Sequence, residues 1–254
     1  MVILKSGDEI ELIRQAGKVV ALTLAAVRAA IRPGVTLLEL DRLGEQVIRD
    51  HGAVPSFLGY KPHFADTPFP ATLCLSVNDA IVHGIPDGYR LREGDVLSVD
   101  CGAVVGGYHA DAATTIGVGA IDPVAERLLA TTERALAAGI ERARPGNRLG
   151  DISHAIGQVA RADGFGIVPD FGGHGVGQRL HEDPQVLNDG QAGRGLRLRE
   201  GLVLALEPMF TAGAGEYVLR PDGWTLATAD RSLAAHFEHT IAVTAEGPEP
   251  LTVE

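Results

Sequence analysis

The chain has 254 residues, of which 45% are hydrophobic, and its formal net charge is −11 at pH 7. This length suits one α/β domain, and the apolar content is sufficient for a large core. The negative charge disfavours a broad nucleic-acid-binding surface, and the two cysteines, Cys74 and Cys101, are too few for a disulfide framework.

The amino terminus and the apolar segments carry no membrane signal. Charged residues between Lys5 and Glu11 interrupt the amino terminus before an apolar region builds, so no signal peptide is predicted. The longest apolar stretch, at residues 19–27, falls well short of the ~20 residues that cross a bilayer. We expect a cytoplasmic protein that does not enter membranes.

Two helices are the first predicted elements. A capping-box pattern opens the first at Ser6, and an Arg-Pro-Gly run at residues 32–34 ends it. A second capping box at Thr36 opens a helix that extends to about Gly52. The loop at residues 53–72 is rich in Pro, Phe and Gly, and such loops often form substrate pockets.

Strands follow the loop, and the order then repeats. The strands are predicted at residues 73–81, 95–104 and 108–118, with a Gly-Gly turn between the last two. Two further helices, at residues 123–142 and 149–163, precede strands and turns that continue to the end.

An internal duplication is visible in the sequence. Residues 91–100 (LREGDVLSVD) match residues 198–207 (LREGLVLALE), and both runs end on an acid. Residues 32–52 echo residues 144–164 at a similar separation, which is too long for solenoid repeats of about 20 to 50 residues.

The duplication predicts one pseudo-symmetric domain of residues 1–254. Its halves would be approximately residues 5–120 and 121–254, with paired strands near the axis bringing acids from both halves to one site. Two separate domains are the alternative, which the lack of a long polar linker between the halves disfavours.

Four carboxylates and one imidazole lie in segments that read as strands or strand edges: Asp100, Asp111, His174, Glu207 and Glu238. Four converging carboxylates would repel one another in a core unless a multivalent cation lay among them. The set therefore predicts a dimetal site. Taken singly, each residue also fits a structural role, such as a turn cap, a paired strand acid or an imidazole bonded to backbone.

The hairpin predicted around the Gly-Gly turn supports the first two ligands. A reversal near residues 105–107 places Asp100 and Asp111 on facing or neighbouring rungs, with Cβ atoms about 4.5 to 5.5 Å apart. This separation suits metal ions ~3.5 to 4 Å apart. Glycines flank His174 and allow the backbone to approach a ligand closely.

Two other motifs are rejected near His174. No Gly-Lys-Ser/Thr sequence follows the glycines, so the stretch is not a phosphate loop. His181 and Glu182 do not begin a zinc-protease H-E-x-x-H motif, because Gln185 occupies its last position.

At these positions the chain resembles the type I methionine aminopeptidases. The resemblance covers nearly the whole chain and rests on five stretches in order: NDAIVHGIP (78–86), VDCGAVVGGYHAD (99–111), GGHGVGQRLHEDP (172–184), EPM (207–209) and RSLAAHFEHT (231–240). It implies the α/β (α+β) pita-bread fold, in which two pseudo-symmetric halves form a central antiparallel β-sheet with helices on the outside.

The resemblance also implies roles for the ligands. Asp111 and Glu238 would bridge two divalent metal ions, Asp100 would chelate one ion, and His174 with Glu207 would complete the other. A hydroxide held between the ions would attack the scissile carbonyl. Glu207 would pass a proton towards the departing amine.

Further catalytic and substrate-binding residues follow from the same resemblance. His181 would hydrogen-bond the scissile carbonyl as charge develops on it, and His83 would contact the amide of the cleaved bond. Aromatic and sulfur groups suit a methionine side chain. The pocket walls would be Phe57, Tyr60, Phe69, Cys74, Leu180 and Trp224, with ordinary core packing as the alternative for Cys74 and Leu180.

Two departures from the family leave details open. Residues 61–71 form a longer link than usual, so the position of Phe69 could slip by a residue or more. His236 stands where many relatives carry glutamine, which leaves the contacts beside Glu238, the pH dependence and the metal preference open.

The function expected is that of a metal-dependent aminopeptidase, a hydrolase that removes the initiator methionine from nascent peptides with a small second residue. Carboxylate-rich sites with one histidine accept Co, Mn, Fe or Zn, so the sequence does not identify the metal. We expect a monomer that associates transiently with the ribosome and binds no nucleic acid stably.

Two alternatives remain. One is a proline-directed aminopeptidase or prolidase of the same fold, although such relatives usually carry a further amino-terminal domain and no room for one exists before Ser6. The other is a non-catalytic binding protein on this fold, which would have lost metal ligands, whereas all five are present.

Overall fold

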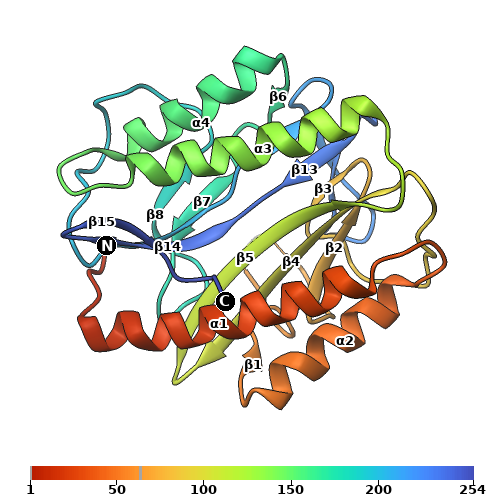
Figure 1. Cartoon of the computed structure of the whole chain (residues 1–254), viewed down its shortest axis with the longest axis horizontal. Helices are drawn as coiled ribbons and strands as arrows, with labels where there is room; N and C mark the ends of the chain where they lie inside the picture. Colours follow the sequence, from red (N-terminus) through yellow and green to blue (C-terminus); the bar gives the residue numbers. More distant parts are fainter. Residues whose placement is uncertain (1, 63–64) are drawn as a thin grey trace.

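The computed structural model of the chain describes residues 2–62 and 65–254. The helices are α1 (Gly7–Ala30), α2 (Leu37–Asp50), α3 (Pro123–Arg142) and α4 (Leu149–Asp163). In the described residues, α1 packs beside α2 and α3 beside α4, and Figure 1 shows antiparallel strands running between these helices. The expected architecture of antiparallel sheets with helices on the outside is confirmed.

The predicted capping signals set the helix ends. The Ser6 hydroxyl accepts the Glu9 N–H, the Glu9 carboxylate accepts the Ser6 N–H, and Thr36 forms the same box with Glu39. Gly164 closes α4 in the left-handed conformation, at φ 77°. No helix in the described ranges is long and apolar enough to cross a membrane.

Two larger sheets face the helix pairs. A four-stranded sheet packs against α1 and α2, and it contains β1 (Val54–Pro55), β2 (Leu73–Val77), β4 (Val96–Val105) and β5 (Tyr108–Gly117). A five-stranded sheet packs against α3 and α4, and it contains β7 (Gly172–Gly175), β8 (Glu182–Leu187), β9 (Val203–Leu206), β14 (His239–Thr244) and β15 (Gly247–Pro250).

Two smaller antiparallel sheets complete the fold. They contain β3 (Ala80–Val82), β6 (Gly166–Ile167), β10 (Met209–Thr211), β11 (Tyr217–Leu219), β12 (Leu226–Thr228) and β13 (Ala234–His236). The strand predicted over residues 73–81 is divided into β2 and β3, because Asn78 takes a positive φ of 56°. The Asn78 amide is held in the turn by the Asp95 carboxylate and the Val96 N–H.

The two halves repeat the same local contacts before their acid-bearing strands. Gly34 donates its N–H to the Leu91 carbonyl, and Gly146 donates to the Leu198 carbonyl. The two glycines have φ values of 92° and 93°. These equivalent turns support the proposal that the chain is one duplicated domain.

Candidate metal centre

The five residues predicted as metal ligands line one cavity of about 430 Å³. Asp100 lies on β4, Asp111 on β5 and His174 on β7, whereas Glu207 directly follows β9 and Glu238 lies between β13 and β14. The fold thus brings together side chains from both halves of the chain, as the duplication predicts.

Asp100 and Asp111 point from the same face of the β4–β5 hairpin, but not from facing rungs. Asp100 is opposite Ala113, and Asp111 is opposite Gly102. The acids are therefore diagonal neighbours two rungs apart, where Cβ atoms typically lie about 7 to 8 Å apart. The prediction that the two acids lie on facing or neighbouring rungs is wrong. The two carboxyl groups still lie close enough to interact: after burial, the charge of Asp111 is the largest contribution to the raised pKa of Asp100.

Backbone contacts hold Glu238 against β5. Its N–H donates to the Ala113 carbonyl at 2.9 Å, and its carbonyl accepts the Ala113 N–H at 3.3 Å. Two residues further on, the Thr240 hydroxyl accepts the Asp111 N–H at 3.0 Å and donates to the Asp111 carbonyl at 2.8 Å. This link between the two larger sheets places Glu238 beside Asp111, and both side chains are buried.

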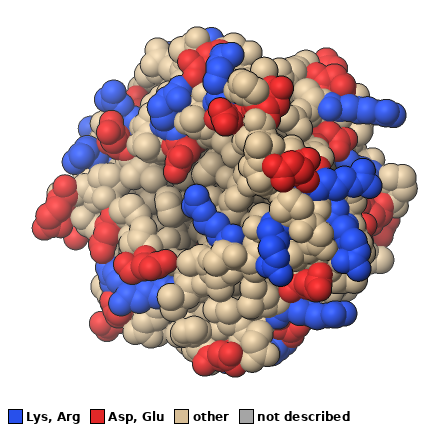
Figure 2. All heavy atoms as spheres, turned by 45° about the vertical axis from the view of Figure 1, so that its right-hand side comes forward, with Lys and Arg blue, Asp and Glu red and all other residues tan. Residues whose placement is uncertain are grey.

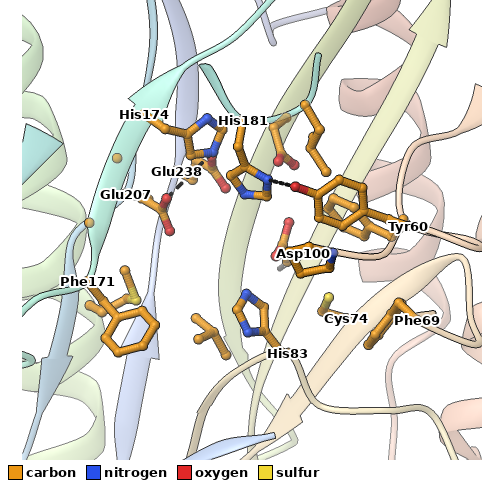
Figure 3. A pocket seen from close by; sticks show the side chains of 18 of the residues that line it. Tyr60, Phe69, Cys74, His83, Asp100, Phe171, His174, His181, Glu207 and Glu238 are labelled. Atoms are coloured by element: carbon orange, nitrogen blue, oxygen red, sulfur yellow. Dashed lines mark hydrogen bonds and ion pairs between the residues drawn. The ribbon is translucent and has the colours of Figure 1, made fainter. Parts of the chain in front are cut away.

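His174 presents one ring nitrogen to the acids. Its Nδ1 lies 2.8 Å from the Gly175 carbonyl oxygen, so Nδ1 carries the proton and Nε2 keeps its lone pair. Nε2 lies 3.7 Å from Oε1 of Glu207 (Figure 3). The Asn188 side-chain amide donates to the Glu207 carbonyl at 2.9 Å and fixes the chain where β9 ends.

Burial raises the pKa of each of the four acids predicted as metal ligands. Burial and then the charge of Glu207 raise the pKa of Asp111 to about 7, and burial raises the pKa of Glu207 to about 7. The pKa values of Asp100 and Glu238 are raised well above the usual range, again mainly by burial. Four such groups can ionise together only when positive charge lies among them.

The donor set fits divalent cations. Within the described residues, buried carboxylate oxygens of Asp100, Asp111 and Glu238 have no hydrogen-bond partner. Two groups have donor atoms within 4.8 Å of one another, namely Asp111, His174 and Glu238, and Glu207, His236 and Glu238. Oxygen donors with an imidazole suit Mn, Fe, Co and Zn.

Two further imidazoles, those of His83 and His181, enter the cavity beside the acids (Figure 3). The His181 ring lies 4.3 Å from the His174 ring, between centroids. His83 has a positive φ of 60°, a conformation that non-glycine residues hold only where the surroundings enforce it. Burial lowers the pKa of His83 to about 4 and that of His181 to about 3.

An apolar cluster forms the other end of the cavity. It contains all six residues predicted to surround a methionine side chain: Phe57, Tyr60, Phe69, Cys74, Leu180 and Trp224. Phe69 stacks edge-on with Phe57 and Trp224, at centroid distances of 6.5 and 5.1 Å. Cys74 joins the apolar end to the acids, because it is opposite Asp100 in the β2–β4 pair.

The long link at residues 61–71 leaves Phe69 in this cluster. Phe69 donates its N–H to the Tyr60 carbonyl at 2.8 Å, and Gly59 donates to the Phe69 carbonyl at 2.9 Å, so the link closes on itself. Residues 63 and 64 of the link lie outside the described residues.

The structure adds lining residues that the sequence did not predict. Phe171, Met209 and Val82 line the same cavity, and Figure 3 shows the Phe171 ring beside the acids. Phe171 directly precedes the glycines before His174, and Met209 closes the EPM stretch, so both were adjacent to recognised signals. On the face shown in Figure 2, acidic and basic side chains are interspersed around a hollow.

Comparisons with known proteins agree with this geometry. The family profile described as metallopeptidase family M24 matches residues 11–245. A methionine aminopeptidase of Clostridium perfringens is 49% identical to this chain, and the match covers 100% of this chain and 99% of the relative's length. Methionine aminopeptidase 1 of Mycobacterium tuberculosis is 48% identical over 98% of this chain and 94% of its own.

Solved structures show the same fold. The crystal structure of a methionine aminopeptidase from Thermotoga maritima matches with a TM-score of 0.96 and 42% identity, over 100% of both chains. A prolidase from Pyrococcus furiosus matches with a TM-score of 0.78 and 22% identity, over 99% of this chain and 66% of its own, and this likeness concerns the fold alone.

Proposed function

The chain belongs to metallopeptidase family M24, and on that premise we propose that it removes the amino-terminal methionine from peptides whose second residue is small. The enzyme class is that of a metal-dependent hydrolase. The observation that carries the proposal is that the acid-lined end and the apolar end belong to one cavity. The two ends meet where Cys74 is opposite Asp100.

The apolar end supports selectivity for methionine. Its aromatic rings and the Cys74 sulfur offer polarizable contacts to a long, unbranched thioether. A lysine side chain would have to bury its charge there, which is costly without a partner. A branched leucine side chain fits the same space less well.

We propose that the acids hold two divalent ions from among Co, Mn, Fe and Zn. Asp111 and Glu238 would contact both ions, Asp100 would bind one, and His174 with Glu207 the other. When bound, such ions polarise a carbonyl oxygen and lower the pKa of water towards neutrality. The orphaned carboxylate oxygens and the lone pair on His174 Nε2 support this assignment.

The remaining roles concern proton and charge handling by the chain itself. Glu207 would accept a proton and pass it to the departing amine, the usual work of a positioned carboxylate. His181 would donate a hydrogen bond to the scissile carbonyl oxygen as negative charge develops there. His83 would contact the amide of the cleaved bond from the opposite side of the cavity.

The biological setting is part of the proposal. We propose that the substrates are amino termini of nascent peptides, and that the enzyme acts in the cytoplasm as a monomer in transient contact with the ribosome. A prolidase activity is less well supported, since prolidase structures match this chain at only 22 to 24% identity and extend well beyond it.

Peptide hydrolysis tests the proposal. After reconstitution with Co²⁺ or Mn²⁺, cleavage of Met-Ala-Ser should exceed cleavage of Leu-Ala-Ser and of Met-Leu-Ser by orders of magnitude, because misplacement of the carbonyl by about 1 Å costs ~10² in rate. Ala-Pro-Ser should not be cleaved. Preferred cleavage of Ala-Pro-Ser would support the prolidase alternative. Equal rates for Met-Ala-Ser and Leu-Ala-Ser would contradict the proposed selectivity of the apolar end for methionine.

A further inference from the structure

His236 is the most deeply enclosed imidazole that has no assigned role. It ends β13 opposite Met209 of β10, and its side chain is 2% exposed. The Thr115 hydroxyl accepts the His236 N–H at 2.8 Å and donates to the His236 carbonyl at 2.7 Å. Thr115 of β5 therefore fixes the His236 backbone, and the close packing around the 2% exposed side chain leaves the imidazole little room to turn away.

The ring faces two of the acids without hydrogen-bonding either. His236 Nε2 lies 3.4 Å from Oε2 of Glu207 and 3.8 Å from Oε2 of Glu238. Both distances exceed the roughly 2.7 to 3.2 Å of an N–H···O bond. Neither ring nitrogen has a hydrogen-bond partner within the part of the chain that the structure describes. A buried imidazole with two orphaned nitrogens is uncommon, because unpaired polar atoms destabilise an interior.

The spacing matches donor atoms that share an ion. Nitrogen and oxygen ligands lie ~2.0 to 2.2 Å from a metal, so neighbouring donors around one ion lie roughly 3 to 3.6 Å apart. The 3.4 Å between His236 Nε2 and Glu207 falls in this range, and the 3.7 Å between His174 Nε2 and Glu207 lies close to it. The two imidazoles face different oxygens of one carboxylate, His174 at Oε1 and His236 at Oε2.

We propose that His236 Nε2 is a sixth protein ligand of the metal centre, binding a divalent cation together with Glu207 and Glu238. This inference rests on the metal centre of the proposed function and extends it. The centre then contains two imidazoles, one on each side of Glu207. A second nitrogen donor favours Co²⁺ and Zn²⁺ over Mn²⁺, since imidazole suits the later metals better than an all-oxygen site does.

The number of imidazoles on the ion can be counted directly. Co²⁺ is added to the metal-free protein until it is saturated, and proton NMR records the hyperfine-shifted ring N–H signals that disappear in D₂O. A histidine bound through Nε2 contributes one such signal from Nδ1–H. We expect two signals, from His174 and His236. A single signal would overturn the proposal, and this count needs no substituted protein.

Substitution then assigns the second signal. His236→Gln should remove it and weaken Co²⁺ binding by at least about tenfold in calorimetry, with a smaller loss for Mn²⁺. The matched control is His239→Gln, because His239 is half-buried on the neighbouring β14 and bonds Thr252 instead of facing the acids. Equal Co²⁺ affinity in His236→Gln and His239→Gln would contradict the proposal.

Peptide cleavage enters neither measurement, so the outcome is separable from that of the proposed activity. A protein that binds no divalent cation at all would refute the metal centre as a whole. A protein that binds Co²⁺ with one imidazole would refute only the role of His236.

Discussion

The hydroxyl oxygen of Tyr60 lies 2.7 Å from Nδ1 of His181, and the two rings are 5.3 Å apart between centroids (Figure 3). Burial, with the neighbouring imidazole of His174, lowers the pKa of His181 to about 3, so its ring carries a single proton at neutral pH. When Tyr60 donates to Nδ1, that proton is on Nε2. In this arrangement His181 holds the tautomer that can donate to a substrate carbonyl.

Tyr60→Phe tests this relationship. Removing the hydroxyl leaves the aromatic wall of the pocket in place but frees His181 to adopt the other tautomer. We expect kcat for Met-Ala-Ser to fall roughly 10- to 100-fold while KM changes little. Tyr217→Phe is the control, because that ring packs on Phe171 and does not contact His181. If only KM changed, Tyr60 would line the substrate pocket without orienting His181.

His181→Ala should have a larger effect of the same kind. A donor that bonds the carbonyl only as it becomes an oxyanion contributes to turnover and not to ground-state binding, and its loss typically costs about 10²- to 10³-fold in kcat. Steady-state kinetics with Met-Ala-Ser measures both constants. If KM rose and kcat were retained, His181 would serve in substrate binding.

Metal affinity should increase with pH. The pKa values of Asp111 and Glu207 are raised to about 7, so below that pH both acids hold protons that a cation must displace. The apparent association constant should rise steeply between about pH 5 and pH 7, by up to about one log unit per pH unit for each displaced proton. Calorimetry in two buffers of different protonation enthalpy gives the protons released at pH 6. An affinity that is constant between pH 5.5 and pH 7.5 would contradict the raised values.

A buried ion pair outside the cavity should control stability. Lys5 Nζ lies 2.7 Å from Oε2 of Glu182, and both side chains are 4% exposed. Lys5→Met leaves the buried Glu182 carboxylate with the Arg179 N–H but without its cation, which should lower the free energy of unfolding by about 3 to 5 kcal/mol. Adding Glu182→Gln should restore part of the loss. Urea unfolding of the metal-free protein measures both effects.

The control for this prediction is an exposed ion pair of the same charge types. Arg49 and Glu45 form an i,i+4 pair on the surface of α2. Arg49→Met should change the free energy of unfolding by no more than about 0.5 kcal/mol. If Lys5→Met and Arg49→Met lowered the free energy of unfolding by similar amounts, burial of the Lys5–Glu182 pair would not make it more important for stability.

Local signals were sufficient to predict the helices and the positions of the acids, but not the register between strands. The capping boxes at Ser6 and Thr36 join residues only three positions apart, so the sequence alone is enough to predict them. The Gly106-Gly107 turn sets Val105 opposite Tyr108, and this puts Asp100 opposite Ala113, two rungs away from Asp111. Alternation along the strands predicted the shared face correctly, whereas the rung depends on where the turn closes.

Contacts distant in sequence explain what was missed. The break at Asn78 depends on the carboxylate of Asp95, which the strand pattern does not reveal. The direction of the His236 ring depends on Thr115, which is 121 residues away. The resemblance marked His236 as a departure beside Glu238, where many relatives carry glutamine, but only the folded chain shows that its ring also faces Glu207.

The most direct test of the account is a metal titration that follows cleavage of Met-Ala-Ser and bound metal together. The protein is first dialysed against a chelator, and Co²⁺ is then added in steps under anaerobic conditions. We predict no cleavage by the metal-free protein, and cleavage that rises with bound metal in the parent but not in Asp111→Asn, which should bind the ion far more weakly. Full cleavage of Met-Ala-Ser by the metal-free protein, or by Asp111→Asn without bound metal, would contradict the assignment of this cavity as the catalytic metal centre.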